Sequence, residues 1–409
     1  MVASLTWIDH DADARERSLR ILSLFQEKES RDELGLGGIR DSFADQLFPG
    51  TSTIQTRLRY MLFVAWIYQS LEGEGLTAAD FARRADKAER DLIDVMRSAD
   101  DRETGIFGGR SGRRLKRLPS SVYWAGLGAW QLRRAGQSQD QYHRSIPHVV
   151  HLRAAQVQRD AERRRNGDDS DHAPDPKTLT WHPRLPTPPT DFPNAANFRL
   201  RKEDALFLRD QLTHSHPHSL LTHLALHCQP TRVEAPWHHP EYATFTDDHR
   251  ELLDHARRFS EVAHGAALLY NLALAETRGW TAKAAEHSAS LTTWLAALNY
   301  ADLCSWSLEQ LWTLTRSEAH VIKPPTRSFV EQWVRAVVAQ RAKLVTNGEV
   351  RELVRARERA LKKARSRFTN RRALDQWGGS SGLAHMTYRW PTARTFLQEL
   401  HDGLNPGSP

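Results

Sequence analysis

LFPGTSTIQTRLRYMLF, residues 47–63, passes from a turn through a polar run into nearly continuous apolar sequence. Pro49 and Gly50 predict a turn that ends a preceding short helix. Ser52 and Gln55 have the spacing of a capping box, in which a side chain at the helix start and one three residues later each bond the other's backbone. The apolar residues that follow cover too many sides for a surface helix, so we expect a buried helix here.

The polar beginning of that helix is a candidate phosphate site. Backbone amides at a helix start, with hydroxyl groups and arginines nearby, suit a phosphate oxygen. The candidate ligands are Thr51, Ser52, Arg57 and Arg59. The alternative is an ordinary helix cap in which Arg57 and Arg59 pair with acids such as Asp41 or Asp45.

Helical periodicity continues through most of the chain. Long examples are residues 78–98, 259–276, 290–314 and 329–345. We find no convincing two-residue hairpin and no alternation of strands with helices. The sequence therefore predicts a mainly α-helical protein, with a small winged-helix-like element in the N-terminal half as an alternative.

Proline and mixed charge distinguish residues 161–195 from the helical sequence on either side. Such composition is typical of a linker or an extended loop. We therefore predict two parts, an N-terminal helical domain over residues 1–160 and a C-terminal helical domain over residues 196–409.

Length and composition indicate a globular protein in a reducing compartment. The 409 residues are enough for two domains, and thirteen Trp and fourteen Phe can fill their cores. Cys228 and Cys304 alone provide no disulfide framework. The start has no signal-peptide pattern, and the apolar runs are shorter than the roughly 20 residues of a membrane span. We expect a cytoplasmic protein that does not bind membranes.

Positive charge is concentrated near the C-terminus. Residues 341–372 contain twelve Lys or Arg and three Glu, a net charge of +9, whereas the whole chain carries +7. A local excess of this kind predicts a surface for a polyanion.

Residues 347–368 within that region predict a basic helix, which a capping box of Thr346 and Glu349 would begin. Its cations recur at helical spacing opposite an apolar side, and the helix has too few acids to neutralise them. The candidate phosphate ligands are Arg351, Arg355, Arg359, Lys362 and Lys363. An acidic protein partner or a solvated face would explain the same pattern.

A second basic stretch, RSGRRLKRLPSS, covers residues 110–121. A flexible basic loop that leads into a helix capped by Ser120 or Ser121 is a layout suited to phosphate. The candidate ligands are Arg110, Arg113, Arg114, Lys116, Arg117 and Ser120. Tyr123 and Trp124, which follow, would either stack on a base or pack in the core.

We assign no catalytic residue, no metal ligand and no cofactor. His223 and His227 have the spacing of a metal-binding pair, but no carboxylate stands between them, so we interpret them as capping and surface residues. Asp41 and Asp45 could bind Mg²⁺, although such pairs are common on helix surfaces. LGLGG at 34–38 lacks the Gly-Lys-Ser/Thr of a phosphate-binding P-loop.

Four stretches carry a resemblance to known sequences. They are ELGLGGIRDSFADQLFPGTSTIQTRLRYMLFVAWIY (33–68), RLKRLPSSVYWAGL (113–126), FSEVAHGAALLYN (259–271) and YRWPTARTFLQEL (388–400). Together they resemble an uncharacterised bacterial protein family of unknown function, across nearly the whole chain. The resemblance supplies no catalytic residues. Its members lie beside helicases, phospholipase-D-like nucleases and DNA methyltransferases, which implies anti-phage defence by association.

The leading hypothesis is a non-enzymatic, nucleic-acid-binding subunit of a bacterial anti-phage defence or DNA-processing assembly. It would contact the DNA or RNA backbone through the basic stretches, in a salt-sensitive manner. One alternative is an adaptor that docks an acidic helicase or nuclease. Another is a metal-dependent nuclease that uses Asp41 and Asp45 or the histidines.

Overall fold

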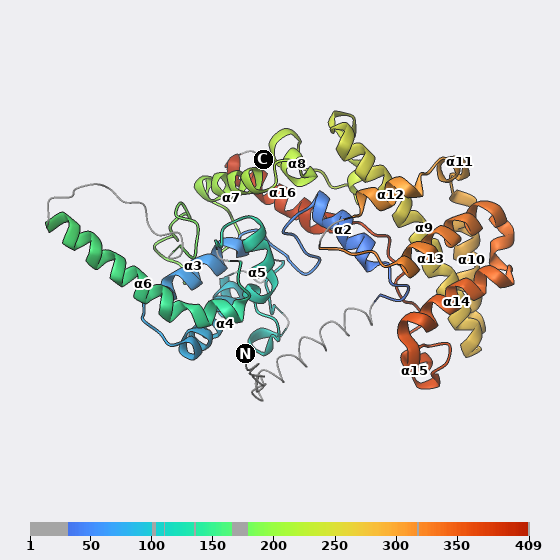
Figure 1. Ribbon diagram of the computed structural model, residues 1–409, viewed down its shortest axis with the longest axis horizontal. Coiled ribbons are helices and arrows are strands. Elements are labelled where there is room, and N and C mark those ends of the chain that lie inside the picture. The colour runs from blue at the N-terminus through green and yellow to red at the C-terminus, as the bar shows by residue number, and fades with distance from the viewer. Residues whose placement is uncertain are drawn as a thin grey trace, which may run out of the picture. The chain divides into compact units, whose positions relative to one another are not determined.

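The computed structural model describes residues 32–99, 104–109, 111–134, 136–165, 179–316 and 319–407. Within these ranges the regular structure is helical and no β-strand forms, although Arg133 and Trp181 make one isolated antiparallel bridge (Figure 1). The prediction of a mainly α-helical protein is confirmed. The winged-helix-like alternative is not found in these ranges, because its hairpin is absent from them.

None of the helices in the described ranges combines the length and the apolar character that a membrane span requires.

The described residues form two compact units, each built from two separate stretches of chain. Unit 1 contains the described residues up to Phe43 together with Glu251–Met386, and unit 2 contains Ala44–Arg250 together with the described residues from Thr387 onward. The predicted division at residues 160 and 195 stays a prediction, and both positions fall within unit 2. Composition marks where the chain leaves regular structure, and it carries no information on which distant stretches pack together. Residues 166–178 of the predicted linker lie outside the described ranges.

Two helices contain the boundaries between the units, α2 (Gly37–Leu47) and α9 (Asp247–Arg278). The other helices of unit 2 are α3 (Tyr60–Glu72), α4 (Ala78–Ala99), α5 (Pro119–Ala129), α6 (Gln139–Arg165), α7 (Lys202–Ser215), α8 (Leu220–His227) and α16 (Trp390–Leu404). Among the described residues, the short 3₁₀ helices of this unit are η1 (Gly112–Arg114), η3 (Pro236–His238) and η4 (Tyr242–Thr244).

The core of unit 2 surrounds α3, which packs against α4 and α5. Tyr60, Phe63, Trp66 and Tyr68 of α3 are all buried and lie among further aromatic rings. The prediction of a buried helix in this part of the sequence is therefore confirmed. The last helix, α16, packs against α7 and α8.

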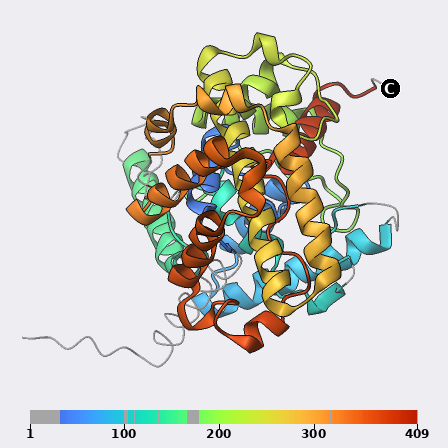
Figure 2. The same ribbon diagram turned by 90° about the vertical axis from the view of Figure 1, so that its right-hand side faces the viewer.

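Unit 1 contains the remaining helices of the described residues, whose ribbons run from yellow to dark orange in Figure 2. They are α10 (Thr281–Ala297), α11 (Tyr300–Cys304), α12 (Leu308–Leu314), α13 (Pro324–Gln340), α14 (Gly348–Lys362) and α15 (Arg371–Asp375), with the 3₁₀ helices η5 (Arg341–Val345) and η6 (Lys363–Arg365).

The core of unit 1 includes a stacked pair of tryptophans. The rings of Trp294 and Trp333 lie 6.4 Å apart between centroids and 15° from parallel. Gly265 of α9 lies directly against Trp294, so closely that an added Cβ would be 2.2 Å from the ring. Glycine is therefore required at this helical position by packing and not by backbone conformation.

Candidate nucleic-acid interface

Residues 51–59 form turns before α3 and not the first turns of that helix. Gln55 Oε1 accepts from the Ser52 amide at 3.0 Å, as half of a capping box would require, but within the described structure the Ser52 hydroxyl has no hydrogen-bond partner. Thr51 is buried, and its hydroxyl donates to the Phe48 carbonyl at 2.6 Å. The predicted helix start at Ser52 is wrong, because Gln55 closes a turn and α3 begins at Tyr60.

Arg57 is bonded within unit 2. Its Nε donates to the carboxylate of Glu399 on α16, and a terminal nitrogen donates to the Thr104 carbonyl at 3.0 Å. The guanidinium also lies over the Phe198 ring, 4.4 Å from its centroid. Glu399 is buried and accepts a second bond from the Leu58 amide at 2.6 Å. Burial raises the pKa of Glu399 to about 7, although Arg57 opposes the rise.

Arg59 is buried more deeply, with 4% of the residue exposed. One terminal nitrogen donates to two oxygens of Asn197, each at 2.8 Å, and the other lies 3.6 Å from the Asp204 carboxylate. Arg57 and Arg59 do pair with acids, as the alternative predicted, but their partners are Glu399 and Asp204 and not Asp41 or Asp45. These two acids bond other arginines.

The loop at the start of α5 keeps three exposed cations that have no acidic partner among the described residues. Arg113, by contrast, pairs with Asp91 at 3.1 Å and with Asp94 at 2.5 Å on α4. Arg110 lies outside the described residues. We name the three exposed cations the loop patch: Arg114, Lys116 and Arg117.

The residues that follow the loop patch are buried. The helix α5 begins at Pro119 without a side-chain cap, so the predicted serine cap is wrong. Ser120 is 1% exposed, and its amide donates to Glu89 Oε2 at 2.8 Å. Tyr123 and Trp124 are both in the core, which leaves neither ring accessible for stacking on a base.

The basic helix α14 begins after Asn347, whose side chain accepts from the Val350 amide at 3.0 Å. The predicted cap of Thr346 and Glu349 is therefore wrong, because Asn347 occupies the capping position. The helix ends at Lys362, and a 3₁₀ turn follows it.

Most of the predicted cations on α14 have acidic partners inside unit 1. The pairs are Arg351 with Glu276, Arg359 with Glu352, and Lys362 with Glu33. Lys362 is 8% exposed and lies 3.4 Å from the Glu33 carboxylate. Arg355 is half-buried near the Phe368 ring, 6.0 Å from its centroid. The helix itself has few acids, as predicted, but Glu276 and Glu33 come from elsewhere in the chain.

A cavity of about 430 Å³ lies beside the end of α14. Arg365, Arg367, Asn370 and Arg372 are among the residues that line it. Arg367 is bonded to Glu33 at 2.8 Å, whereas three exposed cations of residues 362–373, two of which line the cavity, have no acidic partner among the described residues. We name these three the pocket patch: Lys363, Arg365 and Arg372. Sequence reasoning missed Arg365 and Arg372, because they follow the helix and do not share its periodicity.

Comparison with known proteins identifies the family and does not assign an activity. The chain matches DUF6361, described as a family of unknown function, over residues 2–156 and 165–404. No curated protein and no solved structure matches the chain. The match confirms the resemblance to an uncharacterised family, since it covers nearly the whole sequence. The protein thus belongs to DUF6361, a family of unknown function.

Proposed function

We propose that the protein is a non-enzymatic subunit that binds the phosphate backbone of DNA or RNA through the loop patch and the pocket patch. The observation that carries the proposal is the arrangement of unpaired cations. Residues 111–121 and 362–373 contain no Asp or Glu. Each segment presents three exposed cations that no acid among the described residues pairs.

The charge that remains after internal pairing is still large. Residues 341–372 carry +9, and the three acids that pair with them from outside this range, Glu33, Glu276 and Asp375, reduce this to +6. Exposed cations at this density attract any polyanion, and nucleic-acid phosphates release condensed counterions when they are neutralised. We therefore expect binding that weakens steeply with salt.

The pocket patch offers a place for an individual phosphate group. Arg365 and Arg372 carry planar guanidinium groups that can donate two parallel hydrogen bonds to phosphate oxygens. They line the cavity of about 430 Å³ together with Asn370 and with two acids, Glu33 and Glu358, which both accept hydrogen bonds from Arg367. A phosphate group inside this cavity would be contacted from more than one side, whereas a flat surface would contact it from one side only.

Base-specific contacts have no support in the geometry. Tyr123 and Trp124, the aromatic residues beside the loop patch, are buried and cannot stack on bases. Backbone contacts position a protein on nucleic acid without reading its sequence. We therefore propose binding with little sequence preference.

The proposed setting is a DNA-processing or anti-phage assembly in the bacterial cytoplasm, with a helicase or nuclease as neighbour. The family resemblance supports the assembly, and the two free thiols, Cys228 and Cys304, suit a reducing compartment. The same exposed cations would also fit an acidic protein surface. A pull-down from native expression distinguishes the two, since a partner held through nucleic acid is lost after nuclease treatment and a directly docked partner is retained.

The direct test measures the salt dependence of binding to short duplex and single-stranded DNA by fluorescence anisotropy. One variant replaces Arg114, Lys116 and Arg117 with alanine, and a second replaces the pocket patch. The control replaces Arg83, Arg84 and Lys87, which are exposed cations of α4. All three variants lose the same charge, so the control removes the effect of net charge.

We expect each patch variant to reduce the slope of log affinity against log salt by up to about 3 on duplex DNA, while the control keeps the wild-type slope. If the control weakens binding as much as the patch variants do, the patches are not the interface. A wild-type affinity that changes little between about 50 mM and 200 mM salt would refute the proposal altogether.

A further inference from the structure

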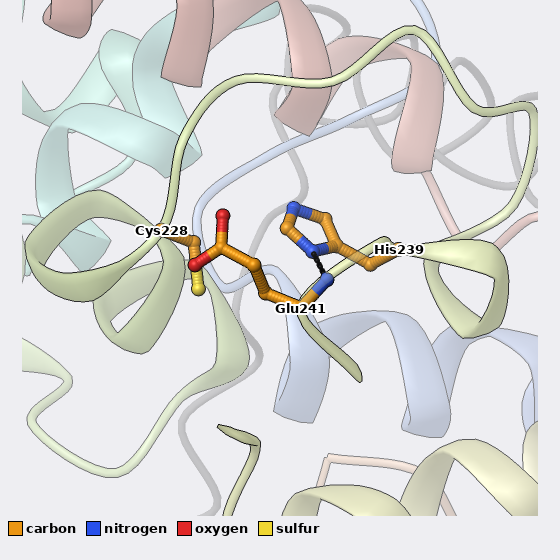
Figure 3. Close-up of side chains that lie close together, drawn as sticks. All are labelled: Cys228, His239 and Glu241. Carbon is orange, nitrogen blue, oxygen red and sulfur yellow. Dashed lines mark hydrogen bonds between the residues drawn. The ribbon is translucent and has the colours of Figure 1, made fainter. Parts of the chain in front are cut away.

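Three potential metal ligands converge in unit 2, and none of them belongs to either basic patch. Cys228 directly follows α8, His239 directly follows η3, and Glu241 directly precedes η4 (Figure 3). A sulfur, an imidazole nitrogen and a carboxylate oxygen from these residues all lie within 4.8 Å of one another. Short helices fix the backbone at each position, so the three side chains are directed toward one another by the fold.

Neighbouring contacts hold the three side chains in this arrangement. The Gln229 amide donates to Glu241 Oε1 at 2.9 Å, which orients the carboxylate. The Glu241 amide donates to Nδ1 of His239 at 3.1 Å, the bond drawn in Figure 3. His239 is 4% exposed, and its ring packs against those of Phe245 and Trp390. The histidine is therefore held firmly, as the ligand of a metal usually is.

The donor set has a clear chemical preference. A thiolate, an imidazole and a carboxylate are the side chains that bind Zn²⁺, at about 2.0–2.3 Å from the ion. Two ligand atoms at those distances from a tetrahedral ion lie roughly 3.5 Å apart. The three ligand atoms here lie up to 4.8 Å from one another, so metal binding would bring them closer by about an ångström. If His239 bound the ion through Nδ1, this nitrogen would lose its hydrogen bond from the Glu241 amide and form a bond to the metal instead. A thiolate and a carboxylate together balance the charge of a divalent cation.

The three residues leave a coordination position for an exchangeable ligand. Cys228 and His239 line a cavity of about 390 Å³, which Arg209, Arg394 and His401 also line. The positive charges of Arg209 and Arg394 disfavour binding of the metal ion itself. Once the ion is bound, the same charges favour an anion at its open coordination position. Arg394 is held in place by bonds to the carbonyls of Arg232 and Val233 at 2.8 and 2.9 Å.

We propose that Cys228, His239 and Glu241 bind one Zn²⁺ ion, whose fourth position faces this cavity and takes water or a small anion. Three protein ligands with one exchangeable position are typical of reactive zinc sites, whereas structural sites use four protein ligands. The histidine pair singled out in the sequence is not part of this group. The rings of His223 and His227 are 5.1 Å apart between centroids, and neither residue belongs to the converging set.

The test uses Co²⁺ as a spectroscopic substitute for Zn²⁺, because a cobalt–thiolate bond produces a near-ultraviolet charge-transfer band. The purified full chain is stripped with chelator, titrated with Co²⁺ and then with Zn²⁺, and its metal content is measured separately. The chain offers a matched control, since Cys304 is its other cysteine and is exposed on α11. The variants are Cys228→Ser, His239→Gln and Cys304→Ser.

We expect one equivalent of metal and the thiolate band in the wild type and in Cys304→Ser, and no band in Cys228→Ser. His239→Gln should weaken Zn²⁺ binding by at least about tenfold, since even a residue that only orients a ligand contributes that much. Thermal unfolding of each variant in chelator shows whether it folds like the stripped wild type. Absence of the band from the wild type, or a band that survives in Cys228→Ser, would overturn the site. Neither outcome bears on the basic patches, because the measurement requires no nucleic acid.

Discussion

Arg57→Ala distinguishes a phosphate ligand from a structural ion pair. The Arg57 side chain is 22% exposed and that of Glu399 is 9% exposed. Without the guanidinium, the Glu399 carboxylate keeps the Leu58 amide, at 2.6 Å, as a donor. Removing one partner of a buried ion pair costs about 3–5 kcal/mol. Because Arg57 is partly exposed, we expect the lower end, about 3 kcal/mol. In a unit of about 230 residues this lowers the melting temperature by roughly 6–12 °C.

The destabilisation should depend on pH in a defined direction. Burial raises the pKa of Glu399 to about 7, above the ordinary value of 4.5. The native state therefore binds more protons than the unfolded state between these values. The stability from this group is fully present below about pH 4.5 and is lost as the pH rises through about 7. Arg57 favours the ionised carboxylate, so its removal raises the pKa of Glu399 further. The variant should differ little from the wild type near pH 5 and by about 2 kcal/mol at pH 8.5, and it should reach the full value of about 3 kcal/mol only above about pH 9, because each pH unit above the wild-type pKa contributes about 1.4 kcal/mol.

Urea unfolding of the wild type and Arg57→Ala near pH 5 and near pH 8.5 measures the two differences. The variant Arg57→Ala/Glu399→Gln is the control, because it has no buried carboxylate to ionise and should lose the pH dependence. An equal destabilisation at both pH values would contradict the ion-pair account. Unchanged stability together with a smaller salt slope for DNA binding would restore Arg57 as a phosphate ligand.

Three further substitutions test other buried contacts. Burial raises the pKa of Glu89 to about 7, so Glu89→Gln should leave stability unchanged below about pH 4.5 and raise it by up to about 3 kcal/mol at pH 8. Urea unfolding at both pH values checks this, and a gain independent of pH would contradict it. Gly265→Ala should lower the free energy of unfolding by about 1–3 kcal/mol, because the new Cβ would collide with Trp294, although helix propensity alone predicts a gain of about 1 kcal/mol. Thermal unfolding gives the sign directly. Lys362→Ala should cost about 2 kcal/mol through its contact with Glu33 and leave the salt slope of DNA binding unchanged; a reduced slope at unchanged stability would reverse that assignment.

The burial of α3 could be predicted from the sequence, whereas its first residue could not. Apolar side chains cover too many sides of Tyr60–Glu72 for a surface helix, so most of this helix has only the core to occupy. The pattern from Ser52 to Gln55 resembled a helix start, and half of its bonds do form. However, the Leu58 amide is satisfied by Glu399, more than 300 residues further along the chain. A tertiary contact of this kind leaves no trace in local spacing.

The candidate sites show the same division between local and distant information. The basic character of α14 is a property of its own residues and was evident from the sequence. Its acidic partners Glu33 and Glu276 are not, because they come from other segments. The group of Cys228, His239 and Glu241 was also missed, since its spacing matches no familiar metal motif. Only the turns that follow α8 and surround η3 and η4 bring the three side chains together.

These differences change the expected number of phosphate contacts and therefore a measurable quantity. The sequence nominated twelve cations, and binding through all of them would give a salt slope near −11 on duplex DNA. Folding places six of the twelve beside acids, which act as intramolecular competitors for any phosphate. The loop patch and the pocket patch, which adds Arg365 and Arg372 to four of the twelve, present six cations that no acid among the described residues pairs, for a slope of about −5. Arg110 lies outside the described residues and would increase the magnitude of the slope by at most about one. A slope near −5 would show that the internal ion pairs persist in the complex, whereas a slope near −11 would require that nucleic acid displace Glu276, Glu33 and the other acids from their arginines and lysines.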